Sequence, residues 1–169
     1  MSTPPPPPPA PTPTRRPRVR RGDDRGAVAV EFALVMPLLL VLLFGVIGYG
    51  YMLSFRQGIS QAAAEGARTA AVLSPSDPAV AGKTRDAVNG ALGSYGVTCA
   101  SNGALMKGAS PAGTCTISAR RPCSNAATSQ CVEVSLAYTY RDDPLLPSFP
   151  GLGVVLPEQL AYSTEAQVN

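Results

Sequence analysis

The first regular pattern along the chain is a long apolar run. Residues 32–53 contain no charged side chain, and these 22 residues match the roughly 20 that a helix needs to cross a bilayer. Residues 54–73 are rich in alanine and lack proline, so the helix is expected to continue until Pro75 and Pro78 stop it. Residues 27–73 would then form one helix of roughly 70 Å, at about 1.5 Å per residue.

The rest of the chain alternates between short helical and strand patterns. Asp77 and Pro78 are typical of a helix start, and they predict a second helix over residues 78–92. Alternating apolar and polar positions predict strands over residues 114–119, 131–140 and 160–168. The predicted fold class is α+β: a long N-terminal transmembrane helix, then a small domain with a short helix and a three-stranded antiparallel sheet.

Charge divides the chain into an inner and an outer side. Residues 1–26 form a leader rich in proline and arginine, with six arginines and two aspartates, whereas eight basic and eight acidic residues follow the span and cancel. The positive-inside rule places the N-terminus in the cytoplasm and residues 54–169 outside a cell membrane. Beside a span, the arginines are interpreted as a topology signal that attracts membrane lipid, and no nucleic-acid partner is predicted.

The predicted organisation follows from these patterns. A disordered cytoplasmic leader (1–26) precedes the transmembrane helix (27–53), the extracytoplasmic continuation of that helix (54–73) and a small α+β domain (74–169). The proline tract of the leader favours extended polyproline II, either as a dispensable segment or as a ligand for a PxxP-binding module. Tyr49, Tyr51 and Phe55 are expected at the outer membrane interface.

The four cysteines all fall in the predicted outer domain, where an even number indicates disulfides. Three connectivities are open for Cys99, Cys115, Cys123 and Cys131. Cys99–Cys115 with Cys123–Cys131 is favoured, because the second bridge would close the loop between two predicted strands. A zinc site is disfavoured, because the cysteines do not occur in close pairs and the chain has no histidine.

A single carboxylate, Glu31, lies one residue before the apolar run, and Gly26 lies five residues before Glu31. Glu31 can rest among headgroups, where the start of a helix favours an anion. Alternatively, cleavage between Gly26 and Ala27 would give Ala27 an ammonium group four residues from Glu31, on one helix face. Glu31 would then pair with that ammonium or with the ammonium of a neighbouring subunit, and so guide subunit association.

Small residues recur every four positions along the predicted helix. Rows of this spacing form the ridges and grooves of helix packing, and small side chains allow a close approach. The alternative is chance in a segment rich in alanine and glycine. The row consists of Gly50, Ser54, Gly58, Ala62, Gly66 and Ala70.

Enzymatic signatures are missing from the sequence. Without histidine there is no Ser–His or Cys–His nucleophilic pair, and no glycine-rich phosphate loop is present. The prediction is a protein that is not an enzyme and that has no cofactor and no metal.

Residues 25–40 (RGAVAVEFALVMPLLL) and 61–68 (QAAAEGAR) resemble the TadE-like family of pilus-assembly pseudopilins. The resemblance implies a membrane-anchored minor component of a tight-adherence (Flp-type) pilus, which a prepilin peptidase would process after Gly26. Its implied partners are other pilin or pseudopilin subunits, the peptidase and the pilus assembly platform. The alternative function is an unprocessed, single-pass extracytoplasmic binding module.

Overall fold

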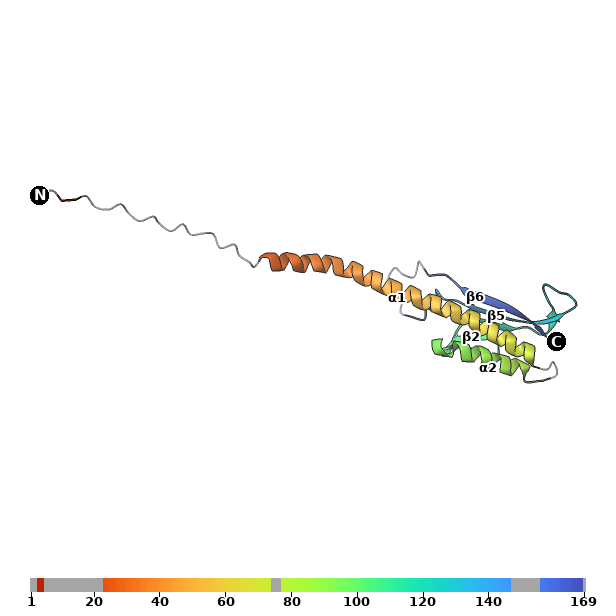
Figure 1. Ribbon diagram of the computed structural model, residues 1–169. Helices are drawn as coiled ribbons and strands as arrows, with labels where there is room; N and C mark the ends of the chain where they lie inside the picture. Colours follow the sequence, from red (N-terminus) through yellow and green to blue (C-terminus); the bar gives the residue numbers. More distant parts are fainter. Residues whose placement is uncertain (1–2, 5–22, 74–76, 147–155, 169) are drawn as a thin grey trace. The chain divides into compact units, whose positions relative to one another are not determined.

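The computed structural model describes residues 3–4, 23–73, 77–146 and 156–168. The chain forms two compact units, Met1–Leu40 and Val41–Asn169. Helix α1 (Asp23–Val72) begins in the first unit and ends in the second. The second unit also holds helix α2 (Val80–Leu92), a 3₁₀ turn (Gly93–Tyr95) and the sheet (Figure 1). Most of the predicted leader and of the proline-rich loop before the last strand lies outside the described residues.

The sheet is antiparallel and is built around one central strand. Strand β5 pairs with β3 over residues 134–138, with β4 over 130–131, and along its other edge with β6 over 130–138. Strands β2 and β1 extend the sheet beyond β3. Within the described residues, the six strands are β1 (Val97–Cys99), β2 (Ala104–Lys107), β3 (Ser110–Ile117), β4 (Arg121–Pro122), β5 (Gln130–Tyr138) and β6 (Leu160–Val168).

The α+β class is confirmed, but the prediction of three strands was wrong, because the sheet has six. The missed strands β1, β2 and β4 span two to four residues, too few to show a period of two. A register shift between Leu105 and Met106 further interrupts the pattern of β2. Gly108, at φ 59°, turns the chain between β2 and β3 in a conformation that favours glycine.

The core lies between the C-terminal part of α1, α2 and one face of the sheet. Phe55 and Ile59 of α1 are fully buried, as are Val134, Leu136 and Tyr138 of β5. The predicted alternation of β5 is therefore confirmed. Burying each large apolar side chain contributes about 1.5–3 kcal/mol, so this one helix–strand contact is a major source of stability.

The prediction that Phe55 lies at the membrane interface was wrong. Its ring lies edge-on to Tyr95 and Tyr138, with centroids 5.1 and 4.9 Å away, and no part of its side chain is exposed. The residue therefore belongs to the folded domain and does not contact headgroups. Met52, 5% exposed, is the first residue of α1 that is buried in the core, whereas Tyr49 remains half exposed.

Helix α2 starts two residues later than predicted. The Asp77 carboxylate accepts a hydrogen bond from the Ala79 amide at 2.8 Å, so it closes a turn before the helix instead of capping it. Thr84, Val88 and Leu92 form the buried face of α2. The helix is also joined to β1, because the Asn89 side chain bonds both the amide and the carbonyl of Cys99.

Both cysteine pairs lie at disulfide distance in the favoured connectivity. Cys99–Cys115 links the end of β1 to β3, with Cα atoms 5.8 Å apart. Cys123–Cys131 closes the loop between β4 and β5, with Cα atoms 4.9 Å apart. The first bridge therefore ties the short strand β1 to β3, and the second ties the segment after β4 to β5.

Candidate processing and assembly segment

The N-terminal part of α1 exposes apolar side chains on every side. Leu34 is 75% exposed and Leu38 is 69% exposed, and the six consecutive residues 38–43 all retain open surface. The most apolar 18-residue window of this helix has a mean hydropathy of 2.7, and none of it is buried within the chain. A helix that is apolar all round requires lipid or other apolar helices around it, so α1 is a candidate membrane span.

The predicted cleavage bond lies in the first turn of α1. Gly26 and Ala27 are the fourth and fifth residues of the helix, and a Cβ at Gly26 would meet nothing within 4 Å. Binding of this segment in extended form would require the turn to unwind. The first four amides of a helix have no partner within it, so unwinding this turn breaks few hydrogen bonds.

Glu31 lies on the surface of the apolar helix between two exposed neighbours, Val30 and Phe32. Within the described part of the chain, its carboxylate forms no hydrogen bond or ion pair. The backbone nitrogen of Ala27 lies four residues earlier on the same helix face. In the uncut chain that nitrogen is an uncharged amide, so an ammonium partner for Glu31 arises only after cleavage.

The row of small residues packs mostly within its own unit. Gly58, Ala62, Gly66 and Ala70 are buried, whereas Gly50 and Ser54 are exposed. A Cβ on Gly58 would come within 2.6 Å of Tyr95, and one on Gly66 within 2.7 Å of Val88. The space that these residues leave is therefore occupied by the domain that follows α1.

Ser54 is also engaged with this domain. The Tyr95 hydroxyl donates to the Ser54 carbonyl at 3.0 Å and lies 3.0 Å from the Ser54 hydroxyl. A Cβ on Gly50, by contrast, would meet nothing within 4 Å. Of the six small residues, only Gly50 thus offers an open position for a partner helix.

The second motif, residues 61–68, has a buried side and an exposed side. Ala62, Ala63, Gly66 and Ala67 face the core, and Glu65 and Arg68 face outward. Glu65 and Arg68 line a shallow groove of about 340 Å³ with Thr69, Val72 and Leu73. Arg120 donates to the Leu73 carbonyl at 3.1 Å and so satisfies a free carbonyl at the end of α1.

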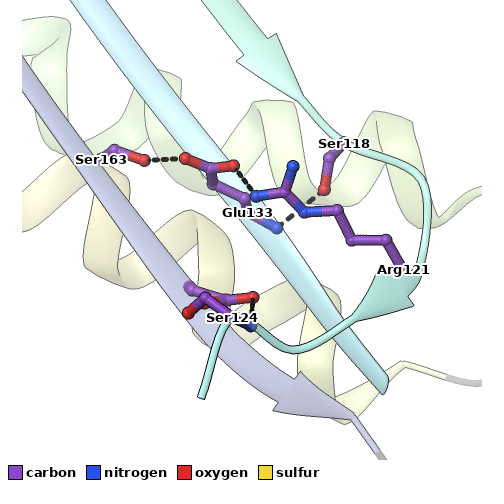
Figure 2. Close-up of polar contacts among 6 residues, drawn as sticks. Ser118, Arg121, Ser124, Glu133 and Ser163 are labelled. Carbon is purple, nitrogen blue, oxygen red and sulfur yellow. Dashed lines mark hydrogen bonds and ion pairs between the residues drawn. The ribbon is translucent and has the colours of Figure 1, made fainter. Parts of the chain in front are cut away.

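Sequence reasoning missed a polar network on the sheet face that points away from the helices. Arg121 and Ser163 both bond the Glu133 carboxylate, and the Glu133 amide donates to the Ser118 hydroxyl at 2.8 Å (Figure 2). Nearby, Glu165 accepts bonds from the amide and hydroxyl of Ser124. Alternating polar residues in β5 and β6 were the available signal for a polar face. Which of these side chains contact each other depends on the sheet register, which the sequence pattern does not give.

Glu133 and Glu165 stand directly opposite each other in the β5–β6 register. Two like charges in this arrangement repel, and the bonds to Arg121, Ser163 and Ser124 offset that repulsion. The hydrogen bond from the Ser124 hydroxyl, which has the larger effect, and the bond from the Ser124 amide both lower the pKa of Glu165. These contacts therefore explain how two carboxylates are accommodated side by side on this face.

Comparison with known proteins places the recognisable part of the chain in its N-terminal helix. The family model described as TadE-like protein matches residues 26–68. No curated protein and no solved structure matches the chain. The match begins at the glycine of the predicted cleavage bond and ends at Arg68. It covers the second motif and all of the first except Arg25, and it excludes α2 and the sheet. The resemblance seen in the sequence is confirmed, and residues 26–68 are a TadE-like segment.

Proposed function

We propose that this protein is a membrane-anchored minor pilin, or pseudopilin, that takes part in assembling a tight-adherence (Flp-type) pilus. The observation that carries the proposal is the all-round apolar surface of α1 around one carboxylate, Glu31. The TadE-like match over the same residues supports it. The role is structural, and no enzymatic activity is assigned to the chain.

The proposed orientation places the leader in the cytoplasm and the sheet domain outside. The arginines before α1 favour this arrangement through the positive-inside rule. The two disulfides agree with it, because disulfides persist in oxidising compartments outside the cytoplasm. The apolar part of α1 would then lie in lipid until it packs against other pilin or pseudopilin helices.

Cleavage by a prepilin peptidase after Gly26 is the first proposed step. The enzyme would unwind the first turn of α1, bind Gly26 in extended form and release a chain that begins at Ala27. Glycine suits this position because it adopts extended and helical backbone at little steric cost. The products are a free leader and a mature helix with an ammonium at its start.

Pairing between Glu31 of one subunit and the Ala27 ammonium of another is the second proposed step. An unpaired charge in a membrane helix costs about 2.5–3.5 kcal/mol at the bilayer centre and less toward the interface. An ammonium partner offsets this cost only at one axial stagger of the two helices. The contact surface would extend from Ala27 to about Gly50, because Gly58 and Gly66 are already packed within the chain.

The mature N-terminus tests the first step. The protein is purified from membranes of pilus-producing cells, and its N-terminal peptide is identified by mass spectrometry. An N-terminus at Ala27 is expected. An intact leader in assembled, functional material would instead favour the anchored binding module that the sequence left open.

A matched pair of variants tests the second step. Glu31→Gln removes the charge at nearly constant shape and is expected to reduce subunit cross-linking and pilus yield about tenfold or more, as for a lost charged hydrogen bond. Glu65→Gln changes an exposed acid elsewhere on α1 and should leave both unchanged. Equal pilus yield from both variants, at equal protein abundance, would contradict the proposed role of Glu31.

A further inference from the structure

The folded domain begins to pack on α1 before the apolar run has ended. Residues 32–53 carry no charge, yet Met52 is already buried in the core, and the ring of Tyr51 lies edge-on to Tyr95 with centroids 6.0 Å apart. These 22 residues measure about 33 Å along a helix, close to the roughly 30 Å of a bilayer's hydrocarbon core. In the proposed anchoring, Met52 therefore lies at the outer edge of the hydrocarbon, and no spacer separates the bilayer from the domain.

One end of the domain faces this edge. A Cβ on Gly66 would lie 3.5 Å from Val134, whereas Phe55 packs against Tyr138 with ring centroids 4.9 Å apart. Strand β5 therefore runs antiparallel to α1, and its C-terminal end points toward the apolar run. The segments at this end of the domain, here called the base, are residues 93–96, 107–110, 141–146 and 156–159.

Hydrogen bonds fix the height of the base along α1. The Tyr95 hydroxyl donates to the carbonyl of Ser54, the first residue after the apolar run, at 3.0 Å. The Gly108 amide donates to the Gly96 carbonyl at 3.4 Å, which brings the turn between β2 and β3 to the same end of the domain. The base is thus held within about one helical turn of the outer end of the run.

The two ends of the β5–β6 loop form the apolar part of the base. The sequence has no charged residue from 144 to 157, and the leucines at 145, 146 and 156 are only half-buried. The Lys107 Nζ atom donates to the Pro144 carbonyl at 2.7 Å. The Arg141 guanidinium donates to the Leu156 carbonyl at 2.8 Å. Both ends of the loop are therefore held in place beside partly open leucine side chains.

The charges of the base and of the adjoining turn of α1 balance. Three are basic and three are acidic: Arg56, Lys107, Arg141, Asp142, Asp143 and Glu158. A surface without net charge does not require an anionic partner. Tyr49, which is half exposed one turn before Leu53, adds a ring of the kind that settles at headgroup depth. This combination of polar groups, leucines and an exposed ring suits the interface of a bilayer with zwitterionic headgroups.

We infer that the base of the domain rests on the outer leaflet of the membrane, with the leucines at 145, 146 and 156 where headgroups meet acyl chains. The inference rests on the proposed anchoring of α1 in a membrane, and it does not depend on cleavage, on Glu31 or on pilus assembly. A second copy of the chain is the competing occupant of this surface. It would cover the base with protein and keep lipid away from it.

Single tryptophans test this inference, because the chain has none of its own. Full-length variants are reconstituted into vesicles of phosphatidylcholine that carries bromine, a short-range quencher, either near the headgroup or near the chain ends. Leu146→Trp and Ala109→Trp place the probe in the base, and Ala109 is exposed in a turn, so its variant should fold. The fluorescence of both should fall at least about twofold with the shallow bromine and less with the deep one, because interfacial rings settle at headgroup depth.

Two control tryptophans separate this inference from the anchoring itself. Leu43→Trp, in the middle of the apolar run, should be quenched most by the deep bromine. Ala127→Trp precedes β5, a strand about 30 Å long, and should not be quenched. An unquenched Leu43→Trp would overturn the membrane anchoring and this inference with it. A quenched Leu43→Trp beside a base tryptophan that is quenched as weakly as Ala127→Trp would overturn this inference alone.

Discussion

At the scale of single residues, Thr84 is a buried polar group whose hydroxyl is left without a partner among the described residues. Its side chain is fully enclosed within the core face of α2, and its Oγ1 atom has no hydrogen-bond partner there. Valine has nearly the same shape and lacks the hydroxyl. Thr84→Val is therefore expected to raise the free energy of unfolding by about 1 kcal/mol, because an unsatisfied buried group costs about 1–3 kcal/mol.

Thermal or denaturant unfolding of the full-length protein in detergent measures this change. Val88→Thr is the matched control, one turn further along the same buried face. It introduces a hydroxyl where there was none and should lower stability by a similar amount. A destabilised Thr84→Val protein would mean that the hydroxyl has a partner after all.

The Glu165–Ser124 contact predicts a pH dependence. The two bonds from Ser124 lower the pKa of Glu165, so the folded state favours its carboxylate form. The resulting stability is present above the pKa of the unfolded chain, about 4.3, and is lost as pH falls through the lower folded value. Ser124→Ala should therefore raise the pKa of Glu165, measured by NMR titration of its carboxyl carbon.

Ser163→Ala provides the control for that titration, because Ser163 bonds Glu133 and does not bond Glu165. The Glu165 titration should keep its midpoint in this variant. A midpoint that is the same in wild type and Ser124→Ala would show that the Ser124 hydroxyl does not hold the carboxylate in solution.

At the scale of elements, the close packing of α1 depends on individual glycines. A Cβ on Gly66 would lie 2.7 Å from a methyl of Val88, which is itself fully buried. Overpacking of this kind costs about 1–3 kcal/mol, more than the gain of up to about 1 kcal/mol from the better helix propensity of alanine. Gly66→Ala should therefore lower the Tm.

Gly90 in α2 is the control position, because no side chain or backbone atom lies close to it. A Cβ there would meet nothing within 4 Å, so Gly90→Ala should raise the Tm through helix propensity alone. If both substitutions raise the Tm, α1 and α2 are not packed as closely as the structure has them.

The elements that sequence patterning predicted are the long ones. α1, α2, β3, β5 and β6 each span eight residues or more, long enough to show a period of 3.6 or of 2, although β3 begins four residues before the predicted strand. Strands of two to four residues are stabilised by hydrogen bonds to the edge of a neighbouring strand. Their own residues carry no pattern that predicts which strand this is. Phe55 was misplaced because an aromatic after an apolar run fits an interface or a core equally well. The spacing of Met52, Phe55 and Ile59 was the available signal for a core stripe.

The candidate sites also differ in whether the local sequence could reveal them. Gly26 and Glu31 stand out locally, as one glycine and one acid beside an apolar run. The Arg121–Glu133–Ser163 network joins residues from several elements, so it became visible only with the register of the sheet. The favoured disulfide pairing was predictable for Cys123–Cys131, because its cysteines flank one loop.

At the scale of the whole molecule, the two disulfides differ in accessibility. Cys99 and Cys115 are each 3% exposed, whereas Cys123 is half-buried. Thiol–disulfide exchange requires a thiolate to reach a sulfur atom. Limited reduction of the folded, full-length protein, followed by alkylation and mass spectrometry, should therefore label Cys123 and Cys131 before Cys99 and Cys115.

The buried bridge should also matter more to stability. It closes the longer loop, with a sequence separation of 16 against 8, and a loop of roughly 15 residues corresponds to about 3 kcal/mol in the chain-entropy account. It also joins β1 to β3. The paired substitution of Cys99 and Cys115 by serine should lower the Tm more than that of Cys123 and Cys131, because it also puts two hydroxyls into the core. Equal losses of Tm would show that the β1–β3 end of the sheet is held by its strand pairing and not by its bridge.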